Sequence, residues 1–461
     1  MNGKITGLLF AVTAASLLHA PALQAKATAE EIARLGKDLT CVGAERAGNA
    51  DGTIPEWSGK WLGKPPHVDF KGTGGHPVDP YPEDKPLFVI TAANMAQYAN
   101  RLSDGQKALF QKYPETFRMP VYQSRRDFRF PDAVCAVTRE NAEKAELVDE
   151  GEGVIATTGG ILFPFPKTGL ELLWTSSIFT YRPYTEELIS DNAYVLADGK
   201  VNWGRVKSRN FAPHLEPGKR TSTTEGRQSS FYLNETLLPE RDKGEINTGM
   251  EFWNHKAAPR QSWRYDPGTR RVRQSPGYGF DMSFPGTGGS ITVDEVRLFN
   301  GTPERFDWKI VGKRELYIPY NTYRLHSPDV KYEDLIKPGH VNPEFMRYEL
   351  HRVWVLEGNL KEGYRHLYGK RVMYIDEDSW LMKMAENYDA RGGLWRTSMM
   401  NYFYAYEANT WQAGVGLYHD LQTGTYLAFN LVNEQRGGYT LNTGKLSDKD
   451  FGPEAARRAG L

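Results

Sequence analysis

Residues 347–357 read RYELHRVWVLE, and their alternation of side-chain types predicts a β-strand. Successive side chains of a strand point to opposite faces of a sheet. One face is apolar apart from a single cation, and it carries Tyr348, Leu350, Arg352, Trp354 and Leu356. The other is mixed, as a half-wet face should be, and it carries Glu349, His351, Val353, Val355 and Glu357. The stretch therefore favours a sheet protein.

The mixed face raises the question of chemistry. Glu349 and His351 are neighbours at i and i+2 and could form an acid–base pair. Such neighbours occur by chance in many strands, so a structural role is the favoured interpretation. The triplet Asp376-Glu377-Asp378 could attract a hard cation, but it lacks the spaced oxygen ligands of an EF-hand. A solvated hairpin turn is the expected state of that triplet.

Similar strand patterns recur from about residue 150 onward, separated by Gly, Pro or charged turns. Within 261–274 a hairpin is predicted, because Asp266-Pro267-Gly268 has turn chemistry. The longest interruption is 276–289, which is rich in Pro and Gly and is interpreted as a flap. The predicted strands are 153–163, 172–181, 193–196, 201–208, 229–235, 250–255, 306–312, 314–318, 348–356, 366–375, 380–388, 394–405 and 426–431.

These strands predict one dominant antiparallel sheet, which must curl into a barrel or half-barrel or fold into a sandwich to cover its inner face. Curling leaves a cavity, and the 11 Trp and 25 Tyr of the chain suit its walls. A lone aromatic is more often core than a ligand contact. The aromatic residues predicted to line the cavity are Trp174, Phe179, Trp203, Phe231, Trp253, Trp263, Tyr265 and Trp354.

The N-terminal part has a different character. Helices are predicted over 30–39, 91–102, 103–113 and 141–147, and 43–86 is an extended arm rich in Gly, Pro and Asp. We expect a signal peptide at 1–25, an α-rich part at 26–150, and the curved sheet at 151–461, as one continuous fold.

The first residues predict export. Lys4 precedes an apolar run that is shorter than a membrane span, and small residues allow cleavage after Ala25 or Ala27. The expected location is the periplasm. An oxidising compartment permits Cys41 and Cys135 to form a disulfide, the alternative being two buried free thiols.

Known catalytic patterns are absent from the sequence. It contains no H-E-x-x-H, no paired His at metal spacing, no G-x-S-x-G elbow and no Cys in a nucleophile motif. The 57 Lys and Arg balance the 57 Asp and Glu, which argues against a nucleic-acid partner. No enzymatic activity, cofactor, metal or catalytic residue is therefore predicted.

Several segments resemble domain-of-unknown-function family 1329, in order along nearly the whole mature chain. The opening match is Leu35–Thr40 with Gly43–Glu45 and Asp51–Pro55. Further matches are Trp263–Pro267, Arg270–Arg273, Phe299–Gly301, Asp307–Lys309, Tyr317–Asn321, Arg347–Trp354, Tyr374–Trp380 and Leu394–Arg396. The resemblance implies a mainly β (α+β) protein. Its fold would be a strongly curved antiparallel half-barrel of LolA/LolB type, with helices and the N-terminal arm covering an apolar cavity.

The resemblance also implies a setting, since members of this family accompany an RND-type exporter and an outer-membrane partner. The leading hypothesis is a periplasmic carrier of a lipid, fatty acid, sterol-like molecule or lipoprotein acyl chain. A second hypothesis is a non-carrying adaptor of an export complex that makes contact through 43–86. A third is a lipid-modifying enzyme that uses Glu349 and His351.

Overall fold

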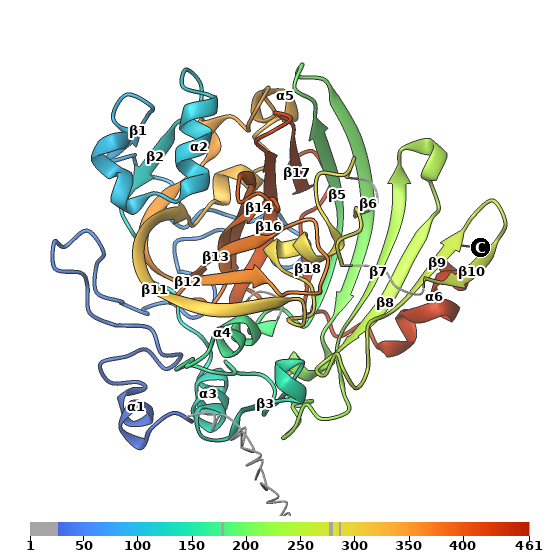
Figure 1. Ribbon diagram of the computed structural model, residues 1–461, viewed down its shortest axis with the longest axis horizontal. Coiled ribbons are helices and arrows are strands. Elements are labelled where there is room, and N and C mark those ends of the chain that lie inside the picture. Colours follow the sequence, from blue (N-terminus) through green and yellow to red (C-terminus); the bar gives the residue numbers. More distant parts are fainter. Residues whose placement is uncertain (1–25, 177–178, 276–279, 285–286, 461) are drawn as a thin grey trace, which may run out of the picture.

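The computed structural model describes residues 26–176, 179–275, 280–284 and 287–460. The expected signal peptide at 1–25 lies outside the described residues. Among the described residues, no helix combines the length and the apolar character needed to cross a membrane. Strands dominate the fold, and most of them belong to a single large sheet (Figure 1).

The sheet is antiparallel at every strand pair except β2 and β12, which run parallel. Its order is β1-β2-β12-β13-β14-β15-β16-β17-β5-β6-β7-β8-β9-β10, with β11 paired to β12 and β18 to β5. Within the described residues β10 and β11 do not pair with each other, so the sheet is not closed into a barrel. The predicted mainly β class with one dominant antiparallel sheet is confirmed.

Short strands lie at both ends of the sheet order, and most of the long strands lie between them. The strands are β1 Phe88–Ile90, β2 Met119–Tyr122, β3 Glu146–Val148, β4 Gly153–Ile155, β5 Thr185–Val195, β6 Val201–Phe211, β7 Gln228–Leu238, β8 Ile246–Phe252, β9 Gln261–Asp266, β10 Arg271–Gln274, β11 Phe306–Pro319, β12 Tyr348–Leu360, β13 Lys370–Asp376, β14 Met382–Tyr388, β15 Leu394–Ala405, β16 Thr410–Asp420, β17 Tyr426–Leu431 and β18 Thr440–Leu441. The short pair β3–β4 forms a separate small sheet.

Helices are short and lie around the sheet (Figure 1). The α-helices are α1 Ala29–Arg34, α2 Asp104–Lys112, α3 Asp132–Lys144, α4 Gly169–Thr175, α5 Tyr332–Leu335 and α6 Gly452–Ala459. The 3₁₀ turns are η1 Met95–Arg101, η2 Asp149–Gly151, η4 Pro213–Leu215, η5 Glu240–Asp242, η6 Val293–Leu298, η7 Tyr323–His326, η8 Pro343–Phe345 and η9 Asp448–Asp450. α2 lies within the predicted helix 103–113 and is capped by Ser103, whose hydroxyl accepts a hydrogen bond from the backbone N–H of Gln106.

Strands β12–β17, which we call the filled half, are largely covered on both faces. Every residue of β14 and β16 is buried, and so are the last ten residues of β15. The N-terminal part of the chain packs here: the Phe128 ring stacks on Tyr404 with ring centroids 4.0 Å apart, and Trp380 Nε1 donates to the Val42 carbonyl over 2.9 Å. A strand buried on both faces has no wet side, so the half-wet face predicted for Glu349 and His351 was wrong.

Strands β5–β10, which we call the open half, are less deeply covered. Eight of the eleven residues of β7 are partly or fully exposed, and its three buried residues are Ser229, Phe231 and Leu233. On one face Phe211 and Phe231 pack against Phe451 beside α6, and Tyr265 Oη donates to the Gly460 carbonyl over 2.8 Å. This face is therefore the apolar one.

Two local predictions fail for physical reasons. Residues 172–181 were predicted as a strand, but α4 covers Gly169–Thr175, because Thr168 and Glu171 form a capping box at its start. Strand β16 was missed because its glycines weaken the strand pattern. Gly414 is required there, since a Cβ atom would lie 1.9 Å from His326 Nε2, which bonds the Val415 N–H over 2.9 Å.

Cys41 and Cys135 form a disulfide, as the sequence favoured. The bridge links the N-terminal arm to α3 and closes a separation of 94 residues. It thus fixes the start of the arm that covers the filled half.

Candidate functional site

A hollow of about 170 Å³ lies between the strands of the open half and a segment that crosses them. We call residues 280–284 and 287–300 the cap segment, since they form the opposite wall with Met400 of β15 and Phe429 of β17. The hollow is lined by Arg182, Glu186, Leu188, Val206, Ser208, Asn210, Ser230, Phe231, Tyr232, Asn234, Thr236, Asn247, Glu251, Arg260, Ser262, Trp263, Phe284, Val293, Val296, Arg297, Asn300, Met400, Phe429 and Asn430.

The strand wall of this hollow is mostly polar. On β6 the alternate residues Val206, Ser208 and Asn210 line it, and β7 contributes Asn234 and Thr236. The register pairs Ser208 with Asn234, which places both side chains on the same face. Because the apolar residues of these strands face α6, small polar side chains are left for the hollow.

The cap wall presents the apolar side chains of Phe284, Val293 and Val296 to the hollow, and Arg297 and Asn300 beside them. It is held to the filled half by two buried carboxylates. Asp294 Oδ2 accepts from Arg371 Nη1 over 2.6 Å, and Glu295 Oε2 accepts from Tyr368 Oη over 2.7 Å. The hollow is therefore bordered by apolar side chains, most of those on the cap, and by polar ones, most of those on the strands.

Three arginines and two glutamates are the charged residues among the lining. Arg297 Nη2 donates to Glu186 Oε2 over 2.6 Å, and Arg260 makes a direct ion pair with Glu251. Burial and the neighbouring Arg297 guanidinium lower the pKa of Arg182 to about 10, although Glu186 opposes this. Positive charge is thus concentrated where Arg182 and Arg297 meet the hollow.

The predicted lining residues are dispersed. Phe231 and Trp263 are among the residues of the hollow, although the Phe231 ring packs toward α6. Trp174, Phe179 and Trp253 pack together in a separate buried cluster, where the Trp174 and Phe179 ring centroids are 4.4 Å apart. This cluster is solid core.

The other three predicted residues lie apart from the hollow. Trp203 is 38% exposed and stacks on Tyr332. Tyr265 is buried against α6, and Trp354 stacks on Trp380. The part of all eight aromatics in ligand binding stays a prediction.

Sequence reasoning missed the polar lining, Ser208 and Asn234 for example, and the three arginines. A usable signal exists in β6, where V-K-S-R-N alternates between small or neutral residues and cations. The alternation separates two faces, but it does not tell which face is concave. In the described part of the predicted 276–289 flap, Phe284 lines the hollow; 276–279 and 285–286 lie outside the described residues.

A second hollow of about 230 Å³ lies near α3 and α4. Lys26 and Ala27, the first described residues, border it. Its walls therefore depend on where the chain begins after the expected cleavage, and it is the weaker candidate.

Glu349 and His351 lie in the filled half, where both side chains are fully buried. His351 Nε2 is 3.1 Å from Glu349 Oε2, while Arg347 Nε donates to Glu349 Oε1 over 2.6 Å. Burial alone would raise the pKa of Glu349, but Arg347 and His351 lower it overall. Burial opposes protonation of His351, yet the carboxylates of Asp378 and Glu349 raise its pKa. The pair thus lies inside a network of charged side chains.

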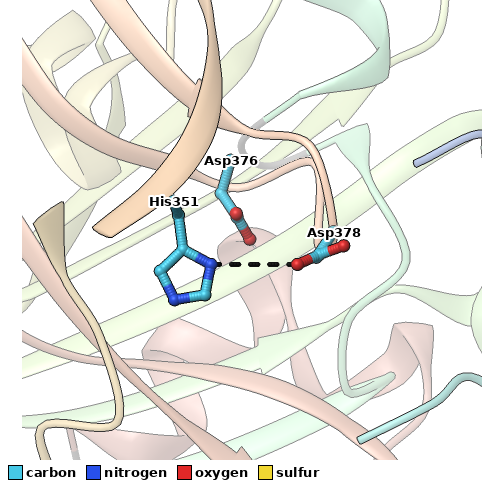
Figure 2. Close-up of side chains that lie close together, drawn as sticks. All are labelled: His351, Asp376 and Asp378. Atoms are coloured by element: carbon cyan, nitrogen blue, oxygen red, sulfur yellow. Dashed lines mark ion pairs between the residues drawn. The ribbon is translucent and has the colours of Figure 1, made fainter. Parts of the chain in front are cut away.

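The predicted solvated turn at 376–378 was also wrong, because these carboxylates face inward. Figure 2 shows Asp378 opposite His351, with 3.8 Å between Asp378 Oδ2 and His351 Nδ1, and Asp376 beside them. Arg126 donates to both oxygens of Asp378 over 2.8 Å, which holds the pKa of that carboxyl well below its usual range despite burial. Arg126 thus supplies the hydrogen bonds that water would donate to the Asp378 carboxylate in an exposed turn.

The three side chains in Figure 2 offer ligand atoms within 4.8 Å of one another, as a metal ion would require. The cations of the protein already balance them. Arg126 pairs with Asp378, and the buried Lys383 lies among the rings of Tyr320, Tyr402 and Trp411, where its charge also acts on Asp376. A divalent ion would add unbalanced positive charge, so the geometry favours a structural role.

Residues 89–457 match the family described as a protein of unknown function, DUF1329. PA3922, an uncharacterised protein of Pseudomonas aeruginosa, is 38% identical over 456 residues, which cover 98% of this chain and 97% of that protein. A solved DUF1329 family protein from Desulfovibrio piger is 14% identical, with a TM-score of 0.40 over 59% of this chain and 92% of that chain. A LolA superfamily protein from Nitrosomonas europaea is 13% identical, with a TM-score of 0.36 over 63% of this chain and 100% of that chain.

Proposed function

We propose, from the premise that the chain belongs to the DUF1329 family, that it is a periplasmic carrier of a small molecule with a substantial apolar part. The ligand is held in the hollow of the open half, between the cap segment and the polar strand wall. The observation that carries the proposal is this hollow, which contrasts with a filled half packed on both faces.

Physical chemistry supports binding without covalent chemistry. Each methylene removed from water contributes about 0.8 kcal/mol, so roughly a dozen amount to on the order of 10 kcal/mol. Phe284, Val293 and Phe429 supply an apolar surface for such a group. The strand wall offers hydrogen-bond partners for the remainder of the molecule.

The enzyme alternative has less support, because its two candidate residues are fully buried among matched charges. A general base must reach the substrate proton within hydrogen-bond distance. The adaptor alternative has less support too, because parts of the 43–86 arm pack on the filled half. The Gly63 N–H donates to Tyr404 Oη of β15, and Tyr406 Oη, just after β15, donates to the Val78 carbonyl over 2.7 Å.

The proposal includes a route through the envelope. The chain is exported, is cleaved after Ala25 or Ala27, and works with an RND-type exporter and an outer-membrane protein. The disulfide between Cys41 and Cys135 supports an oxidising compartment. The family resemblance of the sequence supports the choice of partners.

The test is ligand uptake by the mature protein and by a variant whose hollow is filled. Ser208→Trp places a large side chain in the hollow, whereas Lys207→Trp places the same side chain on the other face of β6. Protein purified from the envelope is extracted for mass spectrometry, and the delipidated protein is titrated with a fluorescent fatty acid. We expect wild type and Lys207→Trp to bind the probe, and Ser208→Trp to lose at least tenfold in affinity.

Two outcomes contradict the proposal. One is wild-type protein that carries no extractable small molecule and takes up no amphiphilic probe. The other is equal binding by both tryptophan variants, which would place any ligand outside the hollow. Circular dichroism of both variants confirms that each is folded.

A further inference from the structure

The charged residues of the hollow define the class of ligand. Its lining contains Arg182, Arg260 and Arg297 against Glu186 and Glu251, one positive charge more than negative. The residues 177–178, 276–279 and 285–286, which lie outside the described ranges, contain no Asp, Glu, Lys or Arg in the sequence. The excess is therefore not offset by a charged residue in those gaps.

The two carboxylates each have a guanidinium in direct contact. Arg297 donates to Glu186 over 2.6 Å, and Arg260 pairs with Glu251 and also donates to the Asn300 carbonyl over 2.7 Å. The third guanidinium, that of Arg182, interacts electrostatically with both Arg297 and Glu186. Burial and Arg297 lower its pKa, and Glu186 raises it. Two guanidinium groups thus act on one carboxylate at this end of the hollow.

A charge that is removed from water is stabilised by an opposite charge that reaches it. An oxyanion can approach Arg182 because this side chain lines the hollow. The same hollow has apolar residues on its cap wall, Phe284, Val296 and Phe429 among them. A single molecule that satisfies both features has an anionic head and an apolar body.

We propose that the ligand is an anionic amphiphile, with a carboxylate or phosphate held by Arg182 and Arg297 and its apolar part against the cap wall. This inference rests on the proposed function, because it specifies the ligand of the same hollow. The polar strand wall with Ser208 and Asn234 suits hydroxyl or ester groups near the head. A cationic amphiphile is disfavoured by the same charges.

The test compares head groups on one chain length, with delipidated mature protein. Palmitate, hexadecyl phosphate, hexadecanol and hexadecyltrimethylammonium are each used to displace the fluorescent fatty acid. We expect the two anions to bind roughly 10- to 100-fold more tightly than the alcohol, as charge-assisted hydrogen bonds predict, and the cation to bind most weakly. The stronger of the two anions identifies which oxyanion the site prefers.

Variants locate the effect. Arg182→Gln should remove most of the preference for the anions while hexadecanol binding is unchanged, and Arg182→Lys should retain part of it. Arg209→Gln is the control, because Arg209 lies on β6 and pairs with Glu187 on the other face. If Arg182→Gln does not fold, the comparison of the four head groups on wild-type protein still tests the inference.

Equal affinity for palmitate and hexadecanol overturns the inference and leaves the carrier proposal standing. The same conclusion follows if Arg182→Gln weakens the binding of hexadecanol as much as the binding of the two anions. Failure of all four amphiphiles to bind wild type overturns both proposals.

Discussion

The two halves of one continuous sheet differ in what surrounds their charged side chains. In the filled half, Glu349 and Asp378 are each bonded by arginines of the protein, and the space around them is occupied by Tyr320 and other aromatic rings. In the open half, charged side chains such as Arg182 border free space. A buried ion that is matched inside the protein stabilises the fold, and an ion beside a hollow is available to a ligand. We therefore assign a structural role to the charges that are packed inside the filled half, and a ligand-binding role to those that border the hollow.

The largest expected effect concerns the cover of the filled half. Replacing Cys41 and Cys135 by Ser should lower the free energy of unfolding by roughly 4–5 kcal/mol, because their bridge closes a loop of 94 residues. Urea unfolding of the double variant measures this against wild type, with and without reductant. An unchanged midpoint would mean that the arm is held by packing alone. Ligand affinity of the folded fraction should be unaffected.

The next effect compares one polar side chain in each half. Asp378→Asn removes the nearer of the two carboxylates that pair with the buried Arg126 and leaves only Glu377 at 3.9 Å, so we expect a loss of about 3 kcal/mol in the free energy of unfolding. Asn234→Ala, in the hollow, should change it by less than about 0.5 kcal/mol and instead reduce ligand uptake. The measurement is chemical denaturation with the fluorescent-probe titration beside it. Comparable losses in both variants would erase the distinction between the halves.

The smallest effect is a pH dependence within the filled half. Burial lowers the pKa of Lys383 to about 8 from 10.5, so between these values the unfolded chain binds a proton that the folded chain has released. Stability should therefore rise with pH in this interval, by up to about 1.4 kcal/mol per pH unit. Buried tyrosines with raised pKa, such as Tyr402, act in the opposite sense as pH increases above about 10.

Lys383→Met checks this prediction, since it fills a similar volume and cannot titrate. Urea unfolding at intervals from about pH 8 to 9.5 should give a positive slope for wild type and a smaller slope for the variant. Identical slopes would show that Lys383 keeps its proton among the rings. The hollow should bind its probe equally well in both proteins.

Much of the fold could be predicted from the sequence, because strand alternation and turn chemistry are local. The run 394–405 was predicted with the bounds of β15, and 426–431 with those of β17. Strand β16 was missed. Its Gly414 is needed because a side chain there would collide with His326, which is 88 residues earlier in the chain, and a local sequence pattern does not contain such a contact.

The site was harder to predict for a related reason. Alternation in β6 separates Lys207 from Ser208, but the concave face depends on where α6 and the cap segment pack. Aromatic residues were expected in the hollow, yet Trp174 and Trp253 fill a solid cluster because the residues around α4 need a core of their own. Whether a side chain is buried depends on its neighbours in the tertiary structure, and these cannot be identified from a single sequence.

Strands β10 and β11 do not pair with each other within the described residues, and this opening in the sheet has a mechanical consequence. In a closed barrel, the number of strands and their stagger fix the radius. Among the described strands no closed ring of hydrogen bonds imposes a radius, so the packing of α6 and the cap segment against the open half contributes to its curvature. For the proposed carrier, a change of curvature that leaves every strand pair intact would let the hollow take ligands of different width.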